Sequence, residues 1–527
     1  MKALHAFLSC FCFAAIATGQ TPAFHWARAA GGSFNDFIRG IAVDSSGNVY
    51  VTGSFTGVAA FGVTNITSNG GLDLFVAKYD SLGNVLWVGQ GGSTLYDDYG
   101  LAIAVDSQGN SYVTGAFSGD ASFGTNTLHN VGGSEILVLK YDTNGNLLWA
   151  RQAGGTSLNS GRGIAVDAAG NSYVTGYFQS VGTFGTTNQV TLTTSVVGDY
   201  DIFLAKYDGT GELVWVRQAG GSLNDVGFGI AVDSGGNSLL TGYFNSSTAM
   251  FDDTNLHNSN LVSTNSPDIF VAKYNSSGNV VWARQAGGAG IDEGFAIAVD
   301  FQGNSYLSGV FSETATFGGL TLTNGGGSAN FIAKYNSAGS VAWAQKLAGG
   351  TDDGSGVVAV DAAGNSYFTG WFSGTASFAN TNLTSTGSND VFVAKFDGLG
   401  HQLWVKKAGG LKLDRGYAIA VDSVGNSYTS GFFEDTSNFD SFALNSAGGW
   451  DCFTARTDGP RLTIGRVANN IIISWPTNAA GLVLQTTTNI TSGAVWLNSS
   501  TSPAIVGEQK VVTNTASGIA TFYRLKN

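Results

Sequence analysis

The stretch Gly40–Gly53 reads GIAVDSSGNVYVTG, and its pattern decides the fold because it occurs seven times along the chain. In each copy an apolar run of the Ile-Ala-Val type precedes a turn, and a second β-prone run follows that turn. A long period with one β-rich unit per repeat indicates a closed or stacked array. The turns begin at Asp44, Asp106, Asp167, Asp233, Asp300, Asp361 and Asp422, at intervals of 62, 61, 66, 67, 61 and 61 residues.

The first repeat predicts four short antiparallel strands joined by hairpins. An apolar run over 41–43 is followed by the turn 44–48, whose Asp can cap turn amides and whose Gly can adopt a positive φ. Strands are then expected over 49–55, 74–79 and 85–88, with a second turn of the same kind at 80–84. A variable segment separates the second strand from the third.

The strand count predicts a ring that is closed by the N-terminus. The chain holds seven copies of the first three strands but only six internal copies of the fourth. The missing copy is Trp26–Gly32, which matches Trp149–Gly155 and would pair with the last repeat. This arithmetic predicts an all-β fold, a seven-bladed β-propeller closed by an N-terminal strand, over residues 24–459. An open β-solenoid is the alternative, and the permuted strand and the four-strand unit disfavour it.

These repeats resemble the bacterial seven-bladed propeller repeat family abbreviated SBBP. The matching parts are Ile-Ala-Val-Asp-x-x-Gly-Asn-x-Tyr-Val-Thr-Gly and Phe-Val-Ala-Lys-Tyr, over about residues 24–459. The resemblance implies an extracytoplasmic propeller. It implies no single activity, and the fold alone does not assign one.

The two ends of the chain predict export and a small appended module. Residues 1–19 carry Lys2, a short apolar run and small residues at 17–19, which is typical of a secretory signal peptide. Residues 461–527 lack the repeat and contain β-prone runs at 461–464, 470–475, 482–486 and 521–525. We expect a small β-sandwich-like domain there.

Charge and cysteine content narrow the function classes. The formal net charge is −13, which disfavours nucleic-acid binding. No second apolar run approaches the ~18 residues of a membrane-spanning helix. Without residues 1–19 only Cys452 remains, so we expect no internal disulfide. We also expect a monomer that is secreted or held at the cell surface.

An acidic position recurs eight residues before each turn aspartate. In a ring near the channel mouth, carboxylates would suit calcium, whereas the alternative is that each caps its own loop or ties neighbouring blades together. We favour the structural interpretation, because a residue that recurs in each repeat usually serves that repeat. The position is occupied by Asp36, Asp98, Asn159, Asp225, Asp292, Asp353 and Asp414.

Ligand contacts are expected where the repeats differ. The segments 183–200 and 249–267 carry the insertions of the third and fourth repeats and are our candidates for a ligand-facing rim. Tyr177, Tyr243 and Trp371, which follow the Gly of the second strand, could stack on sugars, although packing between blades is the commoner use of such rings.

These patterns predict a non-catalytic scaffold that binds an extracellular polysaccharide or protein. No catalytic residue or cofactor site is identified, because the histidines are scattered and no paired-ligand zinc spacing occurs. One alternative is a polysaccharide lyase or hydrolase that uses the Asp ring at the channel mouth. Another is a structural surface protein without a discrete ligand.

Overall fold

The computed structural model contains strands and no helix in the residues that it describes. These are residues 22–258, 266–347, 354–379, 381–458, 463–467, 470–476, 483–488, 496–506, 509–515 and 521–526. The expected signal peptide therefore lies outside the described residues. In the part described, no helix is long and apolar enough to cross a membrane.

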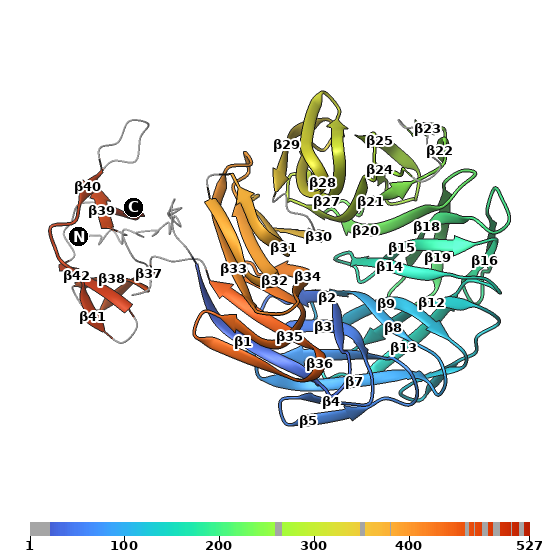
Figure 1. Ribbon diagram of the computed structural model, residues 1–527, viewed down its shortest axis with the longest axis horizontal. Helices are drawn as coiled ribbons and strands as arrows, with labels where there is room; N and C mark the ends of the chain where they lie inside the picture. The colour runs from blue at the N-terminus through green and yellow to red at the C-terminus, as the bar shows by residue number, and fades with distance from the viewer. Residues whose placement is uncertain are drawn as a thin grey trace, which may run out of the picture. The chain divides into compact units, whose positions relative to one another are not determined.

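Phe24–Thr457 form one compact unit, built from four-stranded antiparallel repeats. Seven inner strands begin the repeats: β2 (Phe37–Val43), β8 (Tyr99–Val105), β14 (Ser160–Val166), β20 (Asp225–Val232), β26 (Glu293–Val299), β30 (Gly354–Val360) and β34 (Asp414–Val421). Each inner strand contacts the next, and β34 contacts β2 again, so the described strands close a ring. Figure 1 shows the repeats arranged around a common centre.

The second and third strands form the buried middle of each repeat. The second strands are β3 (Val49–Phe55), β9 (Ser111–Ser118), β15 (Ser172–Gln179), β21 (Ser238–Phe244), β27 (Ser305–Phe317), β31 (Ser366–Phe378) and β35 (Ser427–Phe439). The third strands are β6 (Asp73–Tyr79), β12 (Ser134–Tyr141), β18 (Tyr200–Tyr207), β24 (Asp268–Tyr274), β28 (Leu320–Tyr335), β32 (Thr381–Phe396) and β36 (Phe442–Asp458). Every residue of β3 and β6 is buried, because both faces of a repeat pack against neighbours.

The outer strands are β7 (Val85–Ser93), β13 (Leu147–Ala153), β19 (Leu213–Ala219), β25 (Val280–Gly288), β29 (Val341–Leu347) and β33 (Gln402–Gly410). The last repeat takes its outer strand from the N-terminus: β1 (Ala23–Gly32) lies beside β36 in the sheet order. This is the pairing that the displaced Trp26–Gly32 motif predicts. The same strand continues to β4 (Val58–Phe61) of the first repeat, with Ala30 opposite Phe61.

The segment between the second and third strands is a hairpin. The sequence predicts only a variable segment there. In the first four repeats it forms separate strands: β4 with β5 (Thr64–Thr67), β10 (Ala121–Phe123) with β11 (Asn126–Leu128), β16 (Val181–Phe184) with β17 (Val190–Thr193), and β22 (Thr248–Phe251) with β23 (Thr254–His257). In the later repeats the second and third strands extend to form it. In every repeat but the sixth, where the facing segment lies outside the described residues, the hairpin pairs with the end of the preceding repeat's outer strand and so joins the two.

The recurring turn has the chemistry that its sequence predicts. One carboxylate oxygen of Asp44 accepts hydrogen bonds from the amides of Ser46 and Asn48, both at 2.9 Å. Its other oxygen accepts from the Asn48 side chain at 2.8 Å. Gly47 has a φ of 79°, a conformation in which a Cβ would be strained.

The motif residues also join neighbouring repeats. The Tyr50 hydroxyl lies 3.2 Å from an Asp44 carboxylate oxygen and 3.0 Å from the Gly109 carbonyl oxygen in the next turn along the ring. The Trp87 indole and the Lys78 ammonium group both donate to the Thr143 carbonyl of that repeat. Most of the residues that make the repeat recognisable are therefore occupied in holding the ring together.

The remaining described strands form a second compact unit within Asp458–Asn527. One antiparallel sheet has the order β37 (Thr463–Val467), β38 (Asn470–Pro476), β42 (Gln509–Thr515) and β41 (Ala504–Val506). The other has the order β40 (Leu497–Asn498), β39 (Val483–Thr487) and β43 (Phe522–Lys526). Ile473, Trp475, Leu484 and Val512 form its buried core.

Candidate functional site: a central pocket

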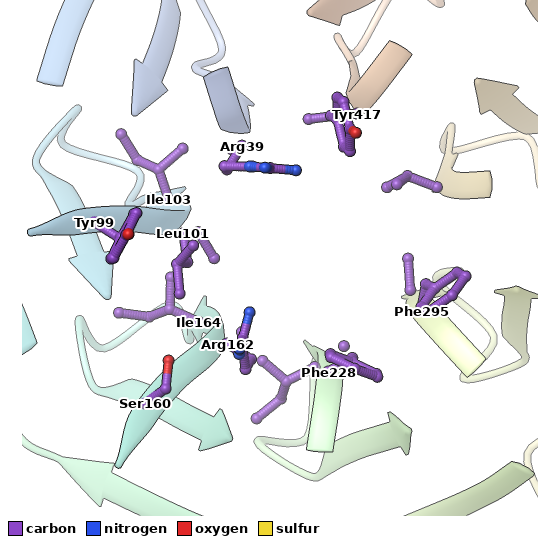
Figure 2. A pocket seen from close by; sticks show the side chains of 18 of the residues that line it. Arg39, Tyr99, Leu101, Ile103, Ser160, Arg162, Ile164, Phe228, Phe295 and Tyr417 are labelled. Atoms are coloured by element: carbon purple, nitrogen blue, oxygen red, sulfur yellow. The ribbon is translucent and has the colours of Figure 1, made fainter. Parts of the chain in front are cut away.

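A cavity of about 610 Å³ lies at the centre of the ring of inner strands. Its wall contains Ile or Val from each inner strand, three residues before the turn aspartate: Ile41, Ile103, Ile164, Ile230, Ile297, Val358 and Ile419. At the position two residues earlier in each inner strand, the side chains differ in chemistry from one repeat to the next. Figure 2 shows the side chains of this second level directed toward the cavity.

A β-bulge in each inner strand produces the diverse level. In β2 the pairing with β3 shifts between Ile38 and Gly40, which leaves Arg39 as the extra residue. A bulge bends the strand and redirects a side chain, so this position can face the cavity. The equivalent extra residues that line the cavity are Leu101, Arg162, Phe228, Phe295 and Tyr417. In β30 the shift spans Gly354 to Val357, and Val357 lines the wall.

Aromatic rings form one side of the pocket. The rings of Phe228 and Phe295 meet edge to face, with centroids 5.6 Å apart. Tyr417 packs on Phe432 with centroids 5.5 Å apart. All three wall rings are half-buried, so each keeps some surface exposed toward the cavity.

Two arginines lie on another part of the wall, in the first and third repeats. The Arg39 guanidinium lies 4.4 Å from the ring centroid of Tyr417, and the Arg162 guanidinium lies 5.4 Å from that of Tyr177. A guanidinium that stacks on a ring face can still donate hydrogen bonds from its edge. Among the described wall residues the one carboxylate is that of Asp97, which accepts hydrogen bonds from the Leu72 amide at 2.9 Å and the Tyr99 hydroxyl at 3.1 Å.

The three aromatic residues named from the sequence have different positions. Tyr177 lines the pocket. Tyr243 packs against Phe228 with ring centroids 5.7 Å apart, and Trp371 packs against Tyr417 with centroids 5.1 Å apart. Neither of these two lines the pocket, so they support wall residues from behind.

The recurring acidic residues are buried and do not line the pocket. Asp36, Asp98, Asp225, Asp292 and Asp414 are at most 1% exposed, while Asp353 lies outside the described residues. Asp225 accepts hydrogen bonds from the amides of Gly221, Asn245 and Ser246 at 2.7, 3.0 and 3.2 Å. Within the described chain, no group of three or more His, Cys, Asp or Glu side chains could hold a metal ion.

A second acidic residue faces most members of this set across the junction between repeats. A Cβ on Gly220 would meet a carboxylate oxygen of Asp201 at 2.7 Å and one of Asp225 at 2.9 Å, so both carboxylates point at one glycine. Burial, reinforced by the partner carboxylate, raises the pKa of Asp225 to about 7. Burial likewise raises the pKa values of Asp36, Asp292 and Asp414 to about 7 and that of Asp98 to about 6.

The described parts of 183–200 and 249–267, which the sequence predicts to form a ligand-facing rim, do not line the central pocket. Thr183 pairs with Gly154, and Met250 pairs with Gly220, so the hairpins β16–β17 and β22–β23 continue outward from the preceding outer strand. They lie at the periphery of the ring (Figure 1), and none of their residues lines the central pocket. The insertions lengthen the outer edge because surface hairpins there tolerate added length.

The bulge residues do not belong to the residue pattern that all repeats share, so that pattern does not predict them. Their signal is nevertheless in the sequence. Five residues before each turn aspartate, the repeats carry Arg39, Leu101, Arg162, Phe228, Phe295, Gly356 and Tyr417, although the residues that follow hardly change. One variable position inside an otherwise repeated strand indicates a side chain that the repeat itself does not need.

The SBBP β-propeller repeat family matches residues 26–54, 148–177, 214–247 and 281–310. An uncharacterised WD repeat-containing protein of Acanthamoeba polyphaga mimivirus is 24% identical over 438 residues, which are 69% of this chain and 31% of that protein. The regulatory protein FlaEY of Caulobacter vibrioides is 32% identical over 114 residues, which are 22% of this chain and 12% of FlaEY. The chain thus spans less than a third of the length of either relative.

Two solved structures align with low scores. A luciferin-regenerating enzyme has a TM-score of 0.31 at 10% identity and covers 82% of this chain and 96% of its own. A puromycin hydrolase has a TM-score of 0.33 at 10% identity, over 83% of this chain and 58% of its own.

Proposed function

We propose that this SBBP-type β-propeller repeat protein is an exported seven-bladed propeller that binds an extracellular glycan without chemical turnover. The closed succession of inner strands from β2 to β34 and the pairing of β1 with β36 support seven blades. The sequence of residues 1–19, with Lys2, a short apolar run and small residues at 17–19, supports export. The ligand would occupy the central pocket rather than the outer hairpins.

The observation that carries this proposal is the composition of the pocket wall. A volume of about 610 Å³ is typical of small-ligand sites. Phe228, Phe295 and Tyr417 offer ring faces on which a sugar ring can pack, and Arg39 and Arg162 offer hydrogen-bond donors. The one wall carboxylate, Asp97, is already hydrogen-bonded on both oxygens, which favours binding over acid–base chemistry.

A bulky side chain at the pocket tests the proposal. Leu101→Trp enlarges a half-buried wall residue and should fill part of the cavity. Leu148→Trp is the matched control, because Leu148 is 51% exposed on the outer strand β13 and lies far from the pocket wall. A ligand that binds only the native state raises the melting temperature.

The measurement is the rise in melting temperature caused by soluble polysaccharides of neutral and acidic composition. We expect at least one to stabilise the unmodified protein and the Leu148→Trp variant, with the rise largely lost in Leu101→Trp. A rise that Leu101→Trp preserves would place the ligand elsewhere. No rise with any polysaccharide would reject glycan binding.

A further inference from the structure

The charge in the pocket is opposite to the charge of the whole molecule. The formal net charge is −13, yet the described wall residues include Arg39 and Arg162 against one carboxylate, that of Asp97. At physiological salt, charges separated by more than ~8 Å are largely screened. A ligand inside the cavity would therefore lie close to two guanidinium groups and distant from most of the acidic surface residues.

The two guanidinium groups have no acidic partner in the described part of the chain. In the ranges that the structure describes, no Asp or Glu forms an ion pair with Arg39 or Arg162. The Nε atom of Arg162 is buried and has no hydrogen-bond partner. Both side chains instead contact ring faces, Arg39 those of Phe37 and Tyr417 and Arg162 that of Tyr177. Both arginines are half-buried at the wall, and guanidinium groups readily bind carboxylates and other planar anions, so two of them without an ion pair in one cavity point to an anionic ligand.

Two other arginines have a structural role, because they form hydrogen bonds between neighbouring repeats. Arg151 and Arg217 each donate three or more hydrogen bonds, mostly to carbonyl oxygens of the following repeat. Both belong to outer strands and serve the junctions. Arg39 and Arg162 instead occupy bulge positions and make no such bonds with the described chain.

We propose that the central pocket selects an acidic saccharide, in which a carboxylate or sulfate ester is bound by Arg39 and Arg162. The sugar ring would pack against the aromatic wall of Phe228, Phe295 and Tyr417. Planar guanidinium groups suit both anions, since each can accept two parallel hydrogen bonds. This inference rests on the proposed function and adds the charge of the ligand to it.

The test compares ligands that differ in charge. Trigalacturonate, its fully methyl-esterified counterpart and a sulfated galacto-oligosaccharide are titrated into the full chain by calorimetry. We expect trigalacturonate or the sulfated sugar to bind at least tenfold more tightly than the ester, and the stronger of the two identifies the anion. Equal affinity for acid and ester would overturn the anionic selectivity but leave glycan binding intact.

Variants assign the selectivity to the two side chains. Arg39→Gln with Arg162→Gln should remove most of the preference for the acidic sugar, while affinity for the ester changes little. Lys412→Gln is the control, because it removes one positive charge from an exposed residue that does not line the pocket. An unchanged preference in the double variant would overturn the assignment. Absence of binding by all three sugars would reject the inference together with glycan binding.

Discussion

At the scale of the residue, the positions that hold the repeats together differ from the positions that face the central cavity. The Tyr, Lys and Trp residues of the repeat motif are buried or bonded to the next repeat, as Tyr50, Lys78 and Trp87 illustrate. One position in each inner strand differs between repeats, and it is the bulge that faces the cavity. The positions that hold neighbouring repeats together are thus alike, whereas the position that faces the cavity varies.

The fourth repeat shows how a lost motif residue is compensated. Leu239 occupies the place of the motif tyrosine and cannot hydrogen-bond to the turn aspartate. There the Lys273 ammonium group lies 2.9 Å from the Asp233 carboxylate, whereas the equivalent distances are 3.9 Å at Asp167 and 3.8 Å at Asp300. A closer ion pair replaces the missing hydroxyl.

The paired acids between repeats predict that the protein is more stable at pH 5 than at pH 8. Burial raises the pKa of Asp225 to about 7 and that of Asp201 to about 6, above the ~3.9 of an unfolded chain. The folded state therefore binds protons that the unfolded state releases. That stabilisation is complete below pH ~4 and is lost as the pH rises through 6 to 7. We expect the melting temperature to fall by several degrees between pH 5 and pH 8.

Asp225→Asn tests this origin, because the third repeat already carries Asn159 at the same position. The difference between the melting temperatures at pH 5 and pH 8 should shrink in the variant. Asp208→Asn is the control: hydrogen bonds within an exposed turn lower the pKa of Asp208, so it does not titrate in this range. A difference that stays the same in Asp225→Asn would contradict the explanation.

At the scale of the element, the prediction from sequence was good where the signal is local. The strand that the sequence predicts over 49–55 has the same bounds as β3, and the turn at Asp44 has the predicted hydrogen bonds. The bulge at Arg39 and the pairing of the hairpin β4–β5 with β1 were missed, because both depend on partners distant in sequence. In the C-terminal unit, β42 was also missed, although its partner β38 was expected over almost its full length.

The position of strand β1 in the sheet predicts that the N-terminal residues are needed for stability. It lies between β36 and β4, and the Trp26 indole donates to the Ser81 carbonyl oxygen at 3.1 Å. Removal of residues 1–33 would leave two sheet edges unpaired, which promotes aggregation. We expect the truncated chain to melt at least 10 °C lower than a chain that begins at Gln20, or to aggregate.

A synthetic peptide of residues 22–33 provides the matching rescue. Added to the truncated chain, it should restore part of the lost melting temperature by occupying the gap. Full stability without the strand would show that closure through β1 contributes little.

At the scale of the whole molecule, the ring brings the bulge side chains, which differ between repeats, together around one cavity. Seven nearly identical inner strands present Arg, Leu, Phe and Tyr side chains to a single cavity. The sequence predicted the ring, because the repeat count and the displaced strand are visible in it. It did not reveal the cavity, because a shared pocket exists only once strands far apart in the chain have closed around it.

The most direct test is a crystal structure of the full chain soaked with trigalacturonate. We expect the sugar in the central cavity, with a carboxylate within hydrogen-bond distance of Arg39 or Arg162 and a ring against Phe228, Phe295 or Tyr417. Sugar bound only at the outer hairpins or in the C-terminal unit, with the central cavity empty, would contradict the account.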